Sequence, residues 1–277
     1  MIRFPNCKIN LGLNVLAKRP DGYHDIETLF WPVPWCDALE ILPAAGKDVS
    51  FRSTGLAIPG DPEENLCVKA FRLMQERHGI PGASIHLHKA VPMGSGLGGG
   101  SSDASFTLMI LDELFGLSLG TGELLRLAAL LGSDCPFFIL NEPCLATGRG
   151  EVLTPFSADL SGMWLLVAVP DVHVGTAGAY RSVTPRIPEV SLTEALKHPV
   201  PQWKTLLVND FEKPVSGMHP EIGALTQEMY QYGAVYAAMS GSGSAVFGIF
   251  PGRPELVNLR NCEVVSWVGE VYFGARR

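Results

Sequence analysis

Residues 92–102 read PMGSGLGGGSS, and the rest of the chain is organised around this glycine-rich stretch. Upstream, Ala83–Lys89 alternates apolar and polar side chains, which predicts a half-buried strand. Downstream, apolar residues recur at helical spacing, so Ser102–Phe115 is predicted to be an amphipathic helix that Ser101 or Ser102 can cap. Backbone N–H groups in a glycine-rich turn can approach an anion closely, and the dipole of the following helix favours negative charge. The stretch therefore indicates an anion-binding loop, with phosphate as the candidate ligand.

Three alternatives apply to the same stretch: a flexible turn, a dinucleotide-binding turn and a P-loop. Gly94, Gly96 and Gly99 satisfy G-x-G-x-x-G, but the dinucleotide fold also needs an acidic residue at the end of the next strand, about twenty residues on. The acidic residues at that distance, Asp112 and Glu113, lie on the predicted helix. A P-loop ends in Gly-Lys-Ser/Thr, and this stretch contains no lysine. A phosphate-binding loop of another kind is the preferred interpretation, with the flexible turn left open.

The composition restricts the classes of partner. The chain has 277 residues, of which 47% are hydrophobic and 18% charged, and its net charge is −7. This negative charge argues against broad nucleic-acid or membrane-surface binding, and an anionic substrate would need local cations. Six cysteines occur without a C-x-x-C pair, which predicts neither a zinc site nor a disulfide framework. Reduced thiols in a cytoplasmic protein are the expectation.

Two segments near the N-terminus carry polar residues in patterns that a fold alone does not require. Pro5–Leu16 is predicted to be a strand, in which Lys8 and Asn10 share one face. A solvent-exposed polar face is the alternative interpretation of this strand. Lys18–His24 reads KRPDGYH, and Pro-Asp-Gly is a turn signal. A hairpin tip explains the aspartate and glycine of this segment, but it does not require the Tyr23-His24 pair.

Two further polar residues stand at predicted helix starts. Asn65 precedes a helix that is predicted to run to about His78, and a capping role alone explains it. Asp134 stands just before Pro136, which suits the first turn of a short helix, so a capping role is the alternative to a chemical one. The segment Ala146–Pro155 contains glycines that need be no more than turn residues.

Taken together, the glycine-rich stretch, the strand around Lys8, the KRPDGYH segment and the GSDCPFF segment at 132–138 resemble the GHMP kinases. This is the superfamily of galactokinase, homoserine kinase and mevalonate kinase. The resemblance implies an α+β fold with two domains. Residues 1–156 would form a domain like domain 2 of ribosomal protein S5, and residues 157–277 a ferredoxin-like domain. The boundary is set in the polar, small-residue stretch Pro155–Gly162.

The resemblance also implies the roles of individual residues. Lys8 and Asp134 would be catalytic, with Asp134 as the base for an acceptor hydroxyl. ATP and Mg²⁺ are the implied cofactors, and no residue is assigned as a metal ligand. The implied substrate-binding residues are Asn10, Tyr23, His24, Thr176 and Tyr180. The implied ATP-binding residues are Pro92, Met93, Gly94, Ser95, Gly96, Leu97, Gly98, Gly99, Gly100, Ser101, Ser102, Asn65 and Lys89.

Within the superfamily, the chain most resembles the branch that phosphorylates the 2-hydroxyl of a cytidine diphosphate ester of methylerythritol, a step of non-mevalonate isoprenoid biosynthesis. In that branch the cytosine would lie between Tyr23 and Tyr180. Two alternatives stay open: a GHMP kinase acting on a sugar or on homoserine, and a nucleotide-binding module without catalysis. The Tyr23-His24 pair argues against the first alternative, and the presence of both Lys8 and Asp134 argues against the second.

Overall fold

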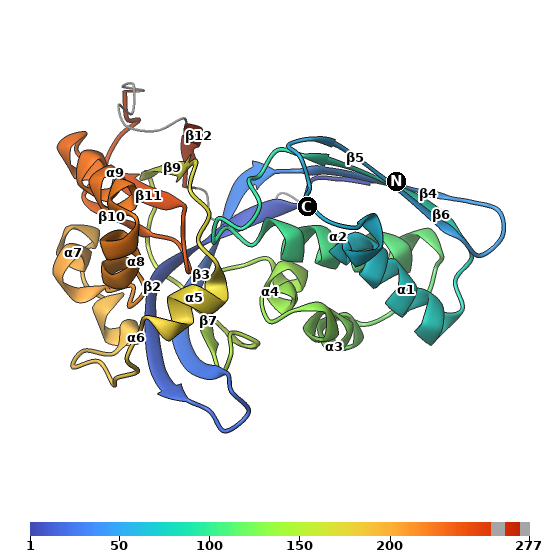
Figure 1. Cartoon of the computed structure of the whole chain (residues 1–277), viewed down its shortest axis with the longest axis horizontal. Coiled ribbons are helices and arrows are strands. Elements are labelled where there is room, and N and C mark those ends of the chain that lie inside the picture. The colour runs from blue at the N-terminus through green and yellow to red at the C-terminus, as the bar shows by residue number, and fades with distance from the viewer. Residues whose placement is uncertain (256–263, 272–277) are drawn as a thin grey trace. The chain divides into compact units, whose positions relative to one another are not determined.

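The computed structural model describes residues 1–255 and 264–271, and these form two compact units (Figure 1). The first unit comprises residues 1–8, 32–93 and 98–142. The second comprises residues 9–31, 94–97 and the described part of 143–277. The units therefore divide the chain differently from the predicted boundary at residue 156, because residues 9–31 and 143–156 group with the later part of the chain. The division into 1–156 and 157–277 stays a prediction.

The first unit is built on a four-stranded sheet in the order β1-β4-β6-β5. Its strands are β1 (Ile2–Arg3), β4 (Ala38–Pro43), β5 (Val49–Gly55) and β6 (Ala83–Lys89). β4 and β6 are antiparallel, with Leu39 opposite Leu87, whereas β5 joins β6 in parallel. The strand predicted for residues 83–89 is confirmed, because alternate side chains of β6 are buried as a half-buried strand requires.

Helices of the first unit cover one face of this sheet (Figure 1). They are η1 (Pro62–Glu64), α1 (Leu66–His78), α2 (Gly99–Leu114), α3 (Thr121–Leu131) and α4 (Cys135–Leu140). Phe71 on α1 and Leu108 on α2 are fully buried in one apolar core with Leu39 and Leu87 of the sheet. The apolar faces of α1 and α3 are therefore buried in the same core as the sheet.

The helix after the glycine-rich stretch begins earlier than its apolar spacing predicts. α2 starts at Gly99, and the preceding residue, Gly98, adopts the left-handed conformation with φ of 70°. No side chain caps this end, so the prediction that Ser101 or Ser102 is the cap is wrong. Both serines lie in the first turn instead, because Gly98 already turns the chain into the helix.

The second unit contains two four-stranded sheets. One has the order β2-β3-β7-β8, and the other has the order β10-β11-β9-β12. The strands are β2 (Asn6–Lys18), β3 (His24–Cys36), β7 (Cys144–Thr147), β8 (Val152–Pro155), β9 (Trp164–Pro170), β10 (Tyr236–Met239), β11 (Val246–Phe250) and β12 (Val264–Glu270). All pairings in the sheet of β9 to β12 are antiparallel, and its order matches the ferredoxin-like arrangement. The α+β class is therefore confirmed.

The helices of the second unit are short, apart from the last one. They are α5 (Thr176–Arg181), α6 (Leu192–Ala195), η2 (Val200–Gln202), α7 (Trp203–Leu206), α8 (Glu212–Met218) and α9 (Pro220–Gln231). Ile222 and Met229 of α9 are fully buried in an apolar core that also holds Phe211 and Val246. None of the described helices combines the length and the apolar composition needed to cross a membrane.

Candidate active site

Three glycines of the stretch at 92–102 have positive φ: Gly94 at 63°, Gly96 at 80° and Gly98 at 70°. A Cβ on Gly96 would collide with the carbonyl oxygen of Ser240, which belongs to the same unit. A Cβ on Gly98 would lie 3.1 Å from Cε of Lys8. Glycine is therefore required here both by the backbone conformation and by the close approach of other parts of the protein.

The serine–glycine loop between β10 and β11 holds residues 95 and 96 of the stretch. The hydroxyl of Ser240 donates to the carbonyl oxygen of Gly96 at 3.0 Å. The amide of Ala245 donates to the carbonyl oxygen of Ser95 at 2.9 Å. The middle of the glycine-rich stretch is thereby fixed within the second unit.

A pocket of about 180 Å³ in the first unit gathers several of the predicted ATP-binding residues. Asn65, Lys89, Met93 and Gly100 all line it, together with Phe51, Ser53, Ile58, Leu66 and Asp103. Asn65 is also the cap of α1, since its Oδ1 accepts from the amide of Cys67 at 2.9 Å. The capping role and the predicted nucleotide contact are therefore compatible. The pocket is bordered by apolar side chains and a few polar groups, as ligand pockets commonly are.

Lys89 lies in a buried cluster of charges with Asp37 and Asp103. Its ammonium contacts Oδ2 of Asp37, and Oδ2 of Asp103 at 2.7 Å. The lysine and Asp37 side chains are 1% or less exposed. The other oxygen of Asp37 accepts from the amides of Ala90 and Val91, at 2.6 and 2.8 Å. The cluster thus joins the end of β6, the chain that leads to the glycine-rich stretch, and the second turn of α2.

Two carboxylates share one ammonium in this cluster, so one of them favours protonation. Burial raises the pKa of Asp103 to about 7, an effect that Lys89 opposes and the neighbouring charge of Asp37 reinforces. Burial by itself lowers the pKa of Lys89, but the two carboxylates outweigh it, and the net shift is upward. Lys89 is therefore held as a cation by the protein. Its role in ATP binding stays a prediction, for which its place in the pocket wall is suitable.

Lys8 and Asp134 lie together in the first unit, although 126 positions separate them. Lys8 Nζ is 3.5 Å from Oδ2 of Asp134. The lysine side chain is 4% exposed and the aspartate side chain 34%. Burial lowers the pKa of Lys8, and the carboxylate of Asp134 opposes this shift. Asp134 stands at the N-cap of α4, but its side chain makes no capping hydrogen bond, so the capping interpretation fails.

The predicted substrate residues all lie in the second unit. The imidazole of His24 stacks on the ring of Tyr180, with centroids 4.9 Å apart and planes inclined by 22°. The hydroxyls of Thr176 and Ser242 are 3.2 Å apart. Asn10 is buried and donates from Nδ2 to the hydroxyl of Thr28 at 2.9 Å. Tyr23 is 56% exposed, and its ring lies over the guanidinium of Arg149.

Three residues beside the predicted ones escaped the sequence analysis: Asp37, Asp103 and Arg149. Asp103 directly follows the glycine-rich stretch, and Asp37 follows a strand, but neither position signals burial. The glycines around Arg149 predict a turn and conceal the contact of its side chain with Tyr23. A local pattern reports which residues neighbour each other along the chain, whereas these contacts join distant segments.

Comparison with known proteins identifies the family. Residues 65–142 match the model of the GHMP kinases N terminal domain, and residues 192–263 match that of the GHMP kinases C terminal. A 4-diphosphocytidyl-2-C-methyl-D-erythritol kinase of Cytophaga hutchinsonii is 48% identical over 269 residues, which covers 97% of this chain and 99% of that protein. One of Bacteroides thetaiotaomicron is 50% identical over 252 residues, covering 90% of this chain and 92% of that protein.

A solved structure agrees with these relatives. The crystal structure of a 4-(cytidine 5'-diphospho)-2C-methyl-D-erythritol kinase superposes with a TM-score of 0.79 at 35% identity, covering 91% of each chain. The chain belongs to the 4-diphosphocytidyl-2-C-methyl-D-erythritol kinase family. It is therefore a phosphotransferase with the GHMP kinase fold. In this member of the family, the predicted catalytic pair Lys8 and Asp134 and the pocket lie within the first unit, and the predicted substrate-binding aromatic residues lie within the second.

The close approach of Gly96 to Ser240 gives a first prediction. Gly96→Ala should lower the free energy of unfolding by more than about 1 kcal/mol, because a left-handed conformation costs about 1–2 kcal/mol in residues with a Cβ and a collision is added to it. Gly100→Ala is the matched control, since Gly100 lies inside α2 and its Cβ would make only an ordinary contact, 3.8 Å from Cδ1 of Leu66 on α1. The control should be neutral or more stable by up to about 1 kcal/mol. Urea denaturation of both variants checks this, and equal stability of the two would contradict it.

The raised pKa of Asp103 gives a second prediction. A carboxyl that binds its proton more tightly in the folded state makes that state less stable as pH rises, here between about pH 4 and about pH 7. Asp103→Asn removes this loss. The stability of the variant relative to the parent should therefore improve from pH 5 to pH 8, as measured by urea midpoints across this range. A difference between the two proteins that does not change with pH would show that Asp103 is not the titrating group.

Proposed function

We propose that this protein transfers the γ-phosphoryl group of ATP to the 2-hydroxyl of 4-diphosphocytidyl-2-C-methyl-D-erythritol. The observation that carries the proposal is the pair formed by Lys8 and Asp134 at 3.5 Å. Membership of the family supports the choice of substrate, because the relatives carry the name of this kinase. The reaction belongs to non-mevalonate isoprenoid biosynthesis.

In the proposed mechanism, Asp134 receives the proton of the attacking hydroxyl or orients that hydroxyl. A base must reach the proton that it removes, and the carboxylate of Asp134 is partly exposed, as this role requires. The ammonium of Lys8 is almost fully buried, so its charge acts in surroundings that screen it little. Lys8 would hold the carboxylate in position and stabilise the negative charge that develops on the hydroxyl oxygen.

The glycine-rich stretch and the start of α2 would bind the phosphates of ATP. Exposed amides at a helix N-terminus attract phosphate, and phosphoryl transfer asks the protein mainly for positioning and charge neutralisation. The pocket lined by Asn65, Lys89 and Gly100 would hold the adenine. A bulky side chain at Gly99 would also disturb the buried charges, because its Cβ would lie 3.0 Å from Nζ of Lys89.

Mg²⁺ is the expected cofactor, since it neutralises phosphate charge in reactions of this kind. Such a site usually needs only one or two protein oxygens beside the phosphates. The hydroxyl of Ser102 fits as one of them, because it is fully buried in the first turn of α2 and makes no hydrogen bond. The proposal assigns the enzyme to the cytoplasm, where thiols remain reduced, and the five cysteines among the described residues are free.

In the second unit, Tyr23, His24 and Tyr180 would bind the cytosine. Stacking between aromatic rings contributes about 0.5–1.5 kcal/mol beyond the burial of apolar area. The stack of His24 on Tyr180 supports this proposal, because it demonstrates a ring position against Tyr180 within that unit. Thr176 and Asn10 would contact the rest of the substrate.

Replacing the proposed base tests the catalytic role. Asp134→Asn should lower kcat by about two to four powers of ten, which is the usual value of general acid–base help, while ATP still binds. Asp112→Asn is the control, because Asp112 in the same unit accepts a structural hydrogen bond from the amide of Leu119. Steady-state ADP release and ATP calorimetry measure both effects. An Asp134→Asn variant with a kcat within about tenfold of the parent would contradict the role.

Tyr23→Ala tests the nucleobase site. The variant should raise KM for the cytidyl substrate and leave KM for ATP nearly unchanged, because Tyr23 is not among the residues that line the pocket. The uridine analogue should be a much poorer substrate for the parent, because a site that pairs buried polar groups rejects a ligand that leaves them unpaired. Steady-state kinetics with both analogues and with ATP measure these effects. Equal turnover of the two analogues, or a Tyr23→Ala defect confined to ATP, would count against this pocket.

A further inference from the structure

The turn between β7 and β8 carries an arginine that the proposed mechanism does not use. Gly148 and Gly150 shape this turn, with φ of 67° and 110°. Between them, Arg149 places its guanidinium carbon 4.9 Å from the centroid of the Tyr23 ring. This separation lies within the range of a cation–π interaction. The turn needs its glycines, but nothing in its backbone requires an arginine at this position.

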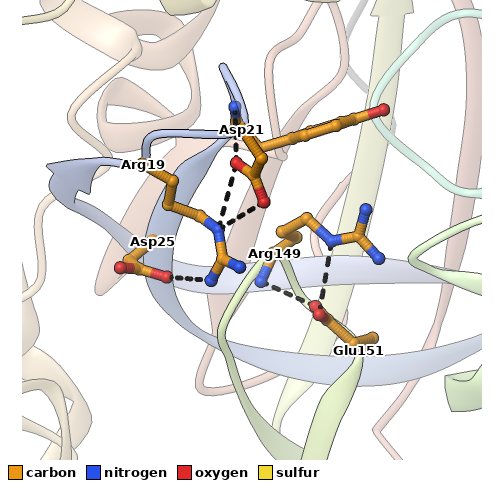
Figure 2. A network of polar contacts seen from close by, with 6 residues as sticks. Arg19, Asp21, Asp25, Arg149 and Glu151 are labelled. Carbon is orange, nitrogen blue, oxygen red and sulfur yellow. Dashed lines mark hydrogen bonds and ion pairs between the residues drawn. The ribbon is translucent and has the colours of Figure 1, made fainter.

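Arg149 is held by Glu151, two residues later. Its backbone amide donates to Oε2 of Glu151 at 2.6 Å, and its Nε donates to Oε1 at 3.3 Å. Figure 2 shows both bonds, and it shows the terminal nitrogens of Arg149 pointing away from Glu151. The side chains of the pair are 35% and 26% exposed. The guanidinium is therefore fixed in orientation while it stays partly accessible.

The backbone of Tyr23 is fixed from the other side of this network. Its amide donates to Oδ1 of Asp21 at 3.1 Å, and Arg19 holds that carboxylate through Nε at 3.0 Å. Arg19 also pairs with Asp25 at 2.8 Å (Figure 2). These contacts fix the main chain of the hairpin tip, but they do not fix the rotation of the exposed Tyr23 ring. The guanidinium of Arg149 supplies that constraint.

We propose that Arg149 is a positioning residue for the nucleobase site: it covers one face of the Tyr23 ring and presents the other face to the base. The inference rests on the proposed function, in which Tyr23 stacks on cytosine. An exposed aromatic side chain that rotates freely loses this freedom when it binds a ligand, and this loss weakens binding. A ring already held by a cation avoids part of the loss. Arg149 therefore acts on affinity for the cytidine ligand and not on the chemical step.

Arg149→Met is the central variant, and CDP is the probe for binding without catalysis. The variant should weaken CDP binding and raise KM for the cytidyl substrate about two- to fivefold, the range of an exposed cation–π contact converted into a binding ratio. Its kcat and its KM for ATP should not change. Arg149→Lys keeps a cation near the ring and should lose less. Glu151→Gln, which frees the guanidinium without removing it, should shift CDP binding in the same direction.

Two further comparisons separate positioning from other effects. Arg253→Met removes an arginine whose guanidinium lies 5.6 Å from the ring centroid of Trp164 in the same unit, and it should leave CDP binding unchanged. In a Tyr23→Ala background, Arg149→Met should have no further effect on CDP binding, because the residue through which it acts is gone.

The outcomes distinguish this inference from the function on which it rests. An equal loss from Arg149→Met with and without Tyr23 would mean that the arginine binds the ligand directly, and positioning would be wrong. If Tyr23→Ala weakens CDP binding while neither Arg149→Met nor Glu151→Gln does, the nucleobase site stands and the positioning role fails. A Tyr23→Ala variant that binds CDP like the parent would overturn the nucleobase site itself, and Arg149 would lose its role with it.

Discussion

The first unit depends on the pairing of one buried ammonium with two carboxylates. Lys89 is 1% exposed, and an ion in such surroundings costs several kcal/mol unless a partner of opposite charge accompanies it. Asp37 and Asp103 are these partners; Asp37 directly follows β3, and Asp103 lies in the second turn of α2. The three residues therefore have to assemble together. Their assembly fixes the chain immediately before and after the glycine-rich stretch, which is where a phosphate-binding loop must be rigid.

The sequence predicts well those elements in which apolar residues recur at a regular spacing. β6, α1 and α3 repeat apolar residues at the spacing of the surface that they bury, so their position can be inferred from the pattern alone. The start of α2 was missed because a left-handed glycine, rather than a serine cap, begins it. The boundary near Pro155–Gly162 marks the chain between β8 and β9, whereas the compact units divide after Glu142. That division depends on the pairing of β7 with β3, for which the local sequence carries no signal.

The candidate site shows the same contrast. The motifs around Lys8 and Asp134 predict their roles, but no spacing rule predicts that residues 126 positions apart lie 3.5 Å from each other. The structure shows this proximity, and the catalytic roles that the resemblance to the GHMP kinases implies for the two residues stay predictions. Asp37 and Asp103 resemble ordinary surface aspartates in the sequence. Their burial depends on the ammonium of Lys89 and, for Asp37, also on the amides of Ala90 and Val91, so it becomes visible only once the fold has brought these groups together.

The stack of His24 on Tyr180 also affects how the strength of binding should be understood. A ligand ring that takes this face of Tyr180 must displace an imidazole that already lies 4.9 Å away. Binding is then an exchange of one aromatic neighbour for another. Each stack is worth about 0.5–1.5 kcal/mol, so the net gain is the difference between the two and can be close to zero. Selectivity at such a position has to come from the hydrogen bonds that the edge of the incoming ring makes, because stacking by itself accepts any aromatic ring.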